Sequence, residues 1–333
     1  MLLATEDVGS LPVLDDFDES RANFNRTVVD KVSIGLDYPC CPQLTGTSSK
    51  PMNMGLQFLL PLSKLNLGIE VKGEDVHILS DEVKETSVPI GTERAEYYLR
   101  FLREQGLISK VKGAKACVTG PFTLASYIDR KNLMTCGASK PNIVTALAKI
   151  LSRSCRRLGD LGFDLVNIDE PFLSVMLGRT VLFKYDQKFV VETLNMLIKE
   201  ASCLSAIHVC GRITPLVKAV LLESEVDIVD HEFAGSPSNL SAYSREELEK
   251  AGKFLAYGCV SSVSPRVETL EEIVGSLSSA LKTFGPRIIV KPDCGFAGML
   301  GIPDAYGIAF GKLKNMVEAA RLVAKSSISG KTP

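Results

Sequence analysis

Residues 164–171 read DLVNIDEP, and residues 205–211 read SAIHVCG. Each stretch is a short apolar run that ends in carboxylate, imidazole or thiol side chains. The residues between them, 188–203, space their apolar side chains as a helix does. A short strand, an amphipathic helix and a second strand make the βαβ unit of a parallel sheet. These stretches therefore predict an α/β fold with its reactive groups at the carboxyl ends of the strands.

The same alternation extends to both sides. Further apolar runs lie at 116–119, 227–230, 254–257 and 287–290, and helical patterns occupy 142–161, 215–222, 268–284 and 303–324. Six such units in a row favour a (β/α)8 (TIM) barrel over an open sheet. No Gly-x-Gly-x-x-Gly follows a first strand, so a dinucleotide-binding fold lacks its usual marker. We expect one catalytic barrel over 1–333, with irregular insertions at roughly 13–110 and a frayed tail at 325–333.

The composition limits the classes of partner and the compartment. The chain has 333 residues, 45% of them hydrophobic, and a net charge of -1, so it lacks the basic surface expected for binding nucleic acid or an anionic membrane. No stretch reaches bilayer-spanning length, and the first residues lack the basic start of a secretory signal. Nine cysteines, an odd number scattered along the chain, indicate reduced thiols. We therefore expect a cytoplasmic protein.

Four side chains that can bind a metal follow the strands. His208 and Cys210 are two residues apart, so in a strand they point to the same side. The next strand ends in Glu232 and the last is followed by Cys294, and a barrel would bring these ends together over its mouth. One nitrogen, two sulfurs and a carboxylate suit tetrahedral zinc. Because cysteine is among the most often buried residue types, a core pair remains the alternative for His208 and Cys210.

A zinc site of this composition suits a reaction at sulfur. A thiol attacks a methyl carbon as its thiolate, whereas a free alkyl thiol is mostly protonated near neutral pH. Zinc overcomes this by taking the sulfur as a ligand and displacing its proton. We therefore assign no separate protein base, because the zinc-activated substrate thiolate would itself be the nucleophile.

Seven motifs run in one order over nearly the whole chain. They are VGSLP at 8–12, GLDYP at 35–39, TGPFT at 119–123, IDEP at 168–171, HVC at 208–210, DIVDHE at 227–232 and PDCG at 292–295. With them the chain resembles the C-terminal catalytic domain of the cobalamin-independent methionine synthase family, especially its short, single-domain archaeal members. HVC with its downstream Glu232, and PDCG, are the most specific of the seven.

The resemblance implies a zinc-dependent methyltransferase that methylates the thiol of homocysteine to give methionine. The family's zinc ligands then fall on four residues, His208, Cys210, Glu232 and Cys294. Its homocysteine-binding residues fall on Val8, Gly9, Ser10 and Asp169, with Glu93 as the nearest match to a further carboxylate. Main-chain N–H groups facing a carboxylate, and a carboxylate facing an ammonium, are what an amino-acid substrate requires.

The methyl donor stays open because the chain departs from the family pattern. It has no tryptophan to stack on a folate, and Tyr127 occupies that place. A family histidine before Ser264-Pro265 is replaced by Val263. The donor is therefore a methyl-corrinoid, free or carried by a corrinoid protein that docks on the mouth, or a methyl-tetrahydropterin.

Three other functions fit parts of the same sequence. A related zinc barrel could methylate another thiol, such as coenzyme M, with a methyl group from a corrinoid protein, and would not need Asp169. A metal-free decarboxylase of the uroporphyrinogen type would tolerate loss of Cys294. A zinc-stabilised scaffold or thiol sensor would have a closed site that accepts no added thiol.

Overall fold

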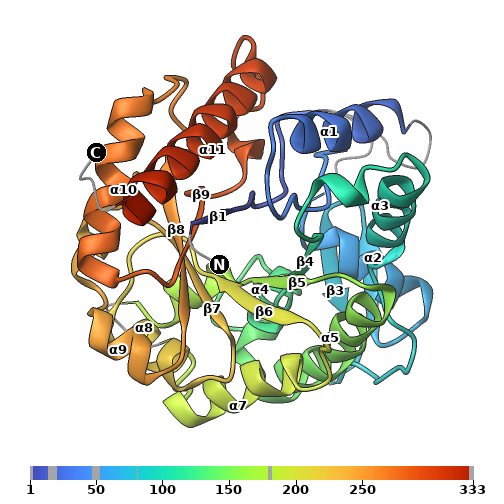
Figure 1. The fold of residues 1–333 in the computed structure, drawn as a ribbon. Helices are drawn as coiled ribbons and strands as arrows, with labels where there is room; N and C mark the ends of the chain where they lie inside the picture. Colours follow the sequence, from blue (N-terminus) through green and yellow to red (C-terminus); the bar gives the residue numbers. More distant parts are fainter. Residues whose placement is uncertain (1–2, 14–20, 47–52, 81, 179–181, 330–333) are drawn as a thin grey trace.

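The computed structural model describes residues 3–13, 21–46, 53–80, 82–178 and 182–329. Seven strands form one parallel sheet in the order β1-β9-β8-β7-β6-β5-β4, and the sheet curls around a central axis (Figure 1). Its strands are β1 (Ala4–Thr5), β4 (Lys115–Thr119), β5 (Leu165–Asp169), β6 (Leu204–His208), β7 (Ile228–Glu232), β8 (Phe254–Val260) and β9 (Ile288–Pro292). The predicted α/β fold is confirmed.

Residues 38–43 close the curled sheet into a barrel between β1 and β4. Tyr38 bridges to Glu6 on one side, and Cys40 bridges to Lys115 on the other. The N–H of Tyr38 donates to Thr5 (2.9 Å), and that of Cys41 donates to Lys115 (2.8 Å). Pro39 and Pro42 interrupt this segment, and proline has no N–H to give to a ladder. The eighth position is therefore held by isolated bridges, which completes the arrangement of a (β/α)8 barrel.

In the described part of the chain eight helices follow β4, and the longer ones lie around the outside of the ring of strands (Figure 1). The eight are α4 (Pro121–Tyr127), α5 (Pro141–Leu161), α6 (Pro171–Met176), α7 (Gln187–Ile198), α8 (Pro215–Glu223), α9 (Arg245–Lys250), α10 (Leu270–Phe284) and α11 (Ala305–Ser329). Four of them begin with proline at the first position, where the missing N–H has no helical partner to lose. The tail predicted to fray from 325 is instead helical to Ser329, and 330–333 lie outside the described residues.

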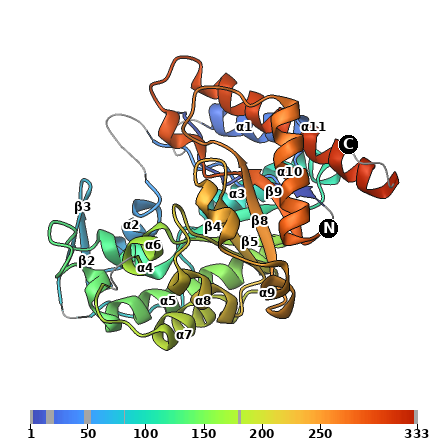
Figure 2. The same ribbon diagram turned by 90° about the vertical axis from the view of Figure 1, so that its left-hand side faces the viewer.

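The front part of the chain is less regular. It contains α1 (Ala22–Ser33), α2 (Leu56–Lys64), α3 (Glu93–Glu104) and an antiparallel hairpin of β2 (Ile69–Lys72) and β3 (Asp75–Ile78). Figure 2 shows the hairpin on the opposite side of the molecule from α10 and α11. Short 3-10 helices lie at Ile108–Lys110, Gly137–Ser139, Pro237–Ser241 and Phe296–Met299.

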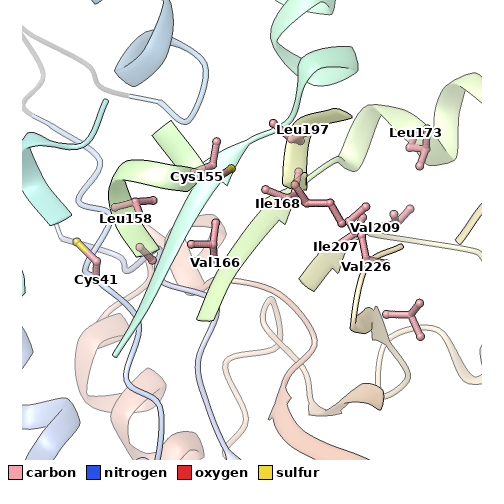
Figure 3. Close-up of a cluster of buried hydrophobic side chains, with 14 of the residues drawn as sticks. Cys41, Cys155, Leu158, Val166, Ile168, Leu173, Leu197, Ile207, Val209 and Val226 are labelled. Atoms are coloured by element: carbon pink, nitrogen blue, oxygen red, sulfur yellow. The ribbon is translucent and has the colours of Figure 1, made fainter. Parts of the chain in front are cut away.

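Because side chains alternate between the two faces of each strand, the sheet contributes to two apolar cores, one outside and one inside the barrel. Outward side chains such as Val166, Ile207 and Val209 pack against the helices in the large core (Figure 3). Inward side chains form a small apolar layer inside the barrel, made of Leu165, Ala206, Ile228, Ala256 and Ile289. Because strand side chains alternate, the residues two positions further along β5, β6, β7 and β9 form the next layer toward the mouth. Within the described residues, no helix is long and apolar enough to cross a bilayer.

Candidate metal and substrate site

Three of the four predicted metal-binding side chains converge at the mouth of the barrel. Nε2 of His208 lies 3.0 Å from Sγ of Cys210, and this sulfur lies 3.7 Å from Sγ of Cys294. The ligand atoms of the three residues all lie within 4.8 Å of one another. Imidazole nitrogen and thiolate sulfur are donors that zinc prefers, so this cluster is of the right kind and size to hold one zinc ion.

Strand register brings these side chains together. His208 ends β6 and is paired with Asp169 of β5 on one side and Asp230 of β7 on the other. Residues in register on neighbouring parallel strands point to the same face, which here is the inside of the barrel. Cys210 lies two residues beyond His208 and so returns to the same side. Cys294 arrives from the chain that follows β9.

Asp230 orients the imidazole of His208 and was not foreseen from the sequence. Its Oδ1 lies 2.7 Å from Nδ1 of His208 and 2.8 Å from Nζ of Lys291. A carboxylate can only accept, so Nδ1 carries the proton and Nε2 faces the two sulfurs. The signal was present in the sequence, because Asp230 precedes Glu232 by two residues and so faces the barrel interior from the strand beside His208.

Glu232, the fourth predicted ligand, does not join this cluster. Its Oε2 accepts hydrogen bonds from the N–H of Gly211 (3.0 Å) and the hydroxyl of Ser236 (3.4 Å). Glu232 does end β7, beside the cluster, as the sequence predicts. The Glu232 carboxylate is thus held by the loops after β6 and β7, and it is close enough to Cys210 to help raise the pKa of that thiol.

A cavity of about 290 Å³ opens over the cluster, and it brings most of the predicted substrate residues together. Val8, Ser10, Tyr127 and Asp169 line it together with the three clustered side chains. Glu93 does not line it. The side chain of Glu93 is exposed at the start of α3, and the next residue, Arg94, faces the cavity instead. Other lining residues that sequence reasoning missed come from the irregular front part, where no periodic pattern marks them: Gln43, Leu44, Thr45, Asn53, Met54 and Gln57.

The segment from Val8 to Ser10 turns sharply at Gly9. Gly9 has a φ of +113°, and a Cβ there would lie 3.0 Å from Sγ of Cys40, so the turn requires glycine. The N–H of Gly9 donates to Oδ2 of Asp7 (3.1 Å). Gly9 therefore shapes the turn, while its two neighbours face the cavity.

The two carboxylates at the end of β5 have different surroundings. Oδ1 of Asp169 accepts a hydrogen bond from Asn167 (2.7 Å), and burial raises the pKa of Asp169 to about 6. Glu170 turns away from the cavity and accepts from the N–H groups of Phe122 and Thr123 and from the Thr123 hydroxyl. Asp169 is therefore the carboxylate available to a ligand, and Glu170 ties the β5 loop to the start of α4.

The electrostatics of the cluster are set by the Asp230 carboxylate and by the contact between the two thiols. Burial disfavours charge on His208, but the Asp230 carboxylate outweighs this effect and raises the pKa of His208 to about 10. The hydrogen bond between the two thiols lowers the pKa of Cys294 well below its usual range and raises that of Cys210. A bound metal ion would displace the protons from Nε2 and from the remaining thiol, because its ligands must be deprotonated.

Fold and site together define a (β/α)8-barrel protein with a nitrogen- and sulfur-donor cluster at the carboxyl ends of its strands. The comparisons with known proteins agree with this class. Residues 86–322 match the family model described as the catalytic domain of cobalamin-independent synthase. The chain therefore belongs to the cobalamin-independent methionine synthase family, a family of methyltransferase enzymes.

Individual relatives support the same family. A methionine synthase of Methanothermobacter thermautotrophicus is 33% identical over 233 residues, which cover 69% of this chain and 70% of that protein. A methionine synthase of Methanothermobacter marburgensis is 28% identical over 308 residues, 92% of this chain and 91% of that one. The structure of a B12-independent methionine synthase from Shewanella sp. W3-18-1, in complex with selenomethionine, matches with a TM-score of 0.68 at 19% identity, over 99% of this chain and 100% of that chain. This last likeness is one of fold.

Proposed function

We propose that this protein is a zinc-dependent methyltransferase that transfers a methyl group to the thiol of homocysteine and forms methionine. The observation that carries the proposal is the convergence of His208, Cys210 and Cys294 in a cavity that also contains Asp169. The cluster suits a metal-bound sulfur, and the carboxylate suits the ammonium of an amino acid. Family membership adds independent support for methyl transfer.

The residues present fit zinc. Two sulfurs and one nitrogen supply three donors, and a catalytic zinc site keeps its remaining position for a water or a substrate. Asp230 holds the imidazole with Nε2 toward the sulfurs, as carboxylates commonly do for zinc-binding histidines. When bound, zinc would supply the Lewis acidity that keeps a thiol substrate deprotonated near neutral pH. We assign Glu232, which ends β7 beside the cluster, as the further ligand of the metal in the absence of substrate.

The rest of the cavity binds and orients the amino acid. Asp169 is ionised above about pH 6 and receives the substrate ammonium. The main chain at Val8 and Ser10, which line the cavity, faces the substrate carboxylate, and Gly9 provides the turn between them. These contacts direct the side chain of homocysteine toward the sulfurs of Cys210 and Cys294. Binding both ends of the amino acid fixes the attacking sulfur against the methyl donor.

The methyl donor approaches through the open side of the cavity, where Tyr127 lies. A methyl-corrinoid, free or delivered by a corrinoid protein, and a methyl-tetrahydropterin are the two donor classes. Tyr127 is half-buried, and its ring packs closely on Gly55: a Cβ atom added at Gly55 would lie 2.9 Å from the ring. It presents the remaining aromatic surface to a flat donor.

Methionine formation by the zinc-loaded protein tests the function directly. We expect product from homocysteine with methylcobalamin or with a methyl-tetrahydropterin, and the productive donor identifies its class. Zinc K-edge spectroscopy should show one additional sulfur ligand when homocysteine is added. Absence of product with both donors, together with an unchanged zinc spectrum, would refute the proposal.

A further inference from the structure

The ammonium of Lys291 occupies a central position beneath the cluster. Its Nζ donates to the carbonyls of Pro292 (2.7 Å) and Asp293 (2.8 Å) and lies 2.8 Å from Oδ1 of Asp230. An ammonium has three donor hydrogens, so these three acceptors use all of them. The side chains of Lys291 and Asp230 are fully buried.

Two of the three acceptors belong to the segment that carries Cys294, and the third, Asp230, contacts the imidazole of His208. Pro292 and Asp293 immediately precede Cys294, so their carbonyls fix the path of the chain into that residue. Oδ1 of Asp230 also receives Nδ1 of His208 at 2.7 Å. Lys291 therefore links the Cys294 segment to the imidazole of His208, although Cys294 follows His208 by 86 positions in the sequence.

We infer that Lys291 is a positioning residue, which holds Cys294 and His208 at the separation that a metal ion requires. The inference rests on the proposed zinc site and extends it to a side chain that does not touch the metal. Before a metal ion binds, the three hydrogen bonds of Lys291 already fix the positions of the Cys294 sulfur and the His208 nitrogen. Less conformational freedom of these side chains is then lost when the ion binds. Residues that orient the ligands of a metal site typically change its affinity by about 10- to 100-fold.

Asp293, two residues after Lys291, holds the loop that follows β7. Its Oδ1 accepts from the N–H groups of Phe233 (2.9 Å) and Ala234 (3.0 Å), and its Oδ2 accepts from Gly235 (2.6 Å). This loop begins directly after Glu232. The two charged residues before Cys294 therefore tie it to the elements that carry the other three candidate ligands.

The barrel offers a matched control in Lys115. Its Nζ pairs with Oε1 of Glu6 at 2.8 Å, and both side chains are fully buried, as in the Lys291–Asp230 pair. Lys115 lies on β4 and Glu6 follows β1, so their ion pair joins strands that carry none of the clustered side chains. Removing either lysine takes the ammonium partner from a buried carboxylate and should lower stability.

The experiment compares zinc binding by Lys291→Met and Lys115→Met with the wild-type protein. Zinc affinity is measured by competition with a chelator of known affinity, and folding is monitored by circular dichroism and thermal melting. We expect Lys291→Met to weaken zinc binding about 10- to 100-fold and Lys115→Met to change it less than about threefold. The Co2+-substituted protein should also show altered sulfur-to-cobalt charge-transfer bands only in Lys291→Met.

Equal zinc affinities in wild type and Lys291→Met, or equal losses in both variants, would overturn the inference. Failure of the wild-type protein to bind zinc would refute the proposed function instead, so the two failures are distinguishable. If the Met variants do not fold, Lys291→Gln and Lys115→Gln provide the same comparison, because glutamine keeps an N–H donor in place of the ammonium. Weaker zinc binding by Lys291→Gln alone supports the inference, and equal affinities contradict it.

Discussion

The two parts of this barrel differ in regularity and in what they contribute to the cavity. From β4 to α11 the chain repeats strand and helix, and this part supplies His208, Cys210, Cys294 and Asp169 from strand ends. The part before β4 holds two of the eight barrel positions, one of them through isolated bridges, and it carries the β2–β3 hairpin. It supplies the polar and apolar walls: Val8, Ser10, Gln43, Leu44, Thr45, Asn53, Met54, Gln57 and Arg94.

This difference indicates that the two parts have separate roles in the site. Donor atoms that must hold an ion need fixed separations, and hydrogen-bonded strands in register provide them. Walls that recognise an organic molecule can be built from loops, which tolerate change more readily. Variants in the regular part should therefore abolish metal binding or thiol binding. Variants at the boundary with the front part should change the affinity for the methyl donor by small factors.

The largest effect is expected from Cys210→Ala/Cys294→Ala. Both sulfurs are removed, and the remaining His208 and Glu232 cannot hold zinc with useful affinity. Zinc content after gel filtration, measured by atomic emission, should fall from about one ion per chain to near zero. Cys259→Ala is a suitable control because this thiol is buried on β8 outside the cluster. Unchanged zinc content in the double variant would contradict the assignment of the metal site.

Asp169→Asn tests the acceptor. If Asp169 binds the ammonium of homocysteine, loss of its charge should lower kcat/KM by about 10- to 100-fold, in line with about 1.5–3 kcal/mol for a hydrogen bond to a charged group. Zinc content should stay unchanged because Asp169 is not one of the clustered donors. An acceptor without an ammonium, such as coenzyme M, would leave activity with that acceptor unaffected. Full activity of the variant with homocysteine would show that Asp169 does not bind the amino group.

The regular part could be predicted well because the spacing of apolar residues identifies its strands and helices, and alternation along a strand shows which side chains share a face. Alternation in a strand places His208 and Cys210 on one side, and the structure has their side chains 3.0 Å apart. The proximity of Cys294 depended on closure of the barrel, which the count of strand–helix units indicated. Local periodicity cannot fix a side-chain rotamer, so it could not show that Glu232 bonds to Gly211 and Ser236.

The front part was harder to predict because it has no period to follow. The sequence indicated Glu93, which is the first residue of α3 and is exposed, whereas Arg94, one residue further along, lines the cavity. The buried pairs of Asp230 with Lys291 and of Glu6 with Lys115 join strands far apart in the sequence. Buried charges of this kind become recognisable only once strand register is known.

The pH dependence offers a smaller and independent test of the regular part. Burial raises the pKa of Asp169 to about 6, so the carboxylate is ionised above this pH and neutral below it. Since kcat/KM reports groups of the free enzyme, its value for homocysteine should fall about tenfold per unit below pH 6. Zinc content must be measured at each pH, because protonation of His208 and the thiols also releases metal. If kcat/KM did not fall below pH 6 while the zinc content stayed constant, ionised Asp169 would be excluded as the group that binds the ammonium.

Tyr127 lies where the two parts meet, and its replacement should have the smallest effect. The ring belongs to α4 of the regular part and packs on Gly55 of the front part. Tyr127→Ala should raise KM for the methyl donor about 2- to 10-fold with kcat nearly unchanged, because an aromatic contact contributes about 0.5–1.5 kcal/mol. Tyr127→Phe keeps the ring and should retain the wild-type KM. If Tyr127→Ala left the KM for the methyl donor unchanged and impaired homocysteine binding instead, the ring would belong to the homocysteine site. The methyl donor would then not contact the boundary between the two parts.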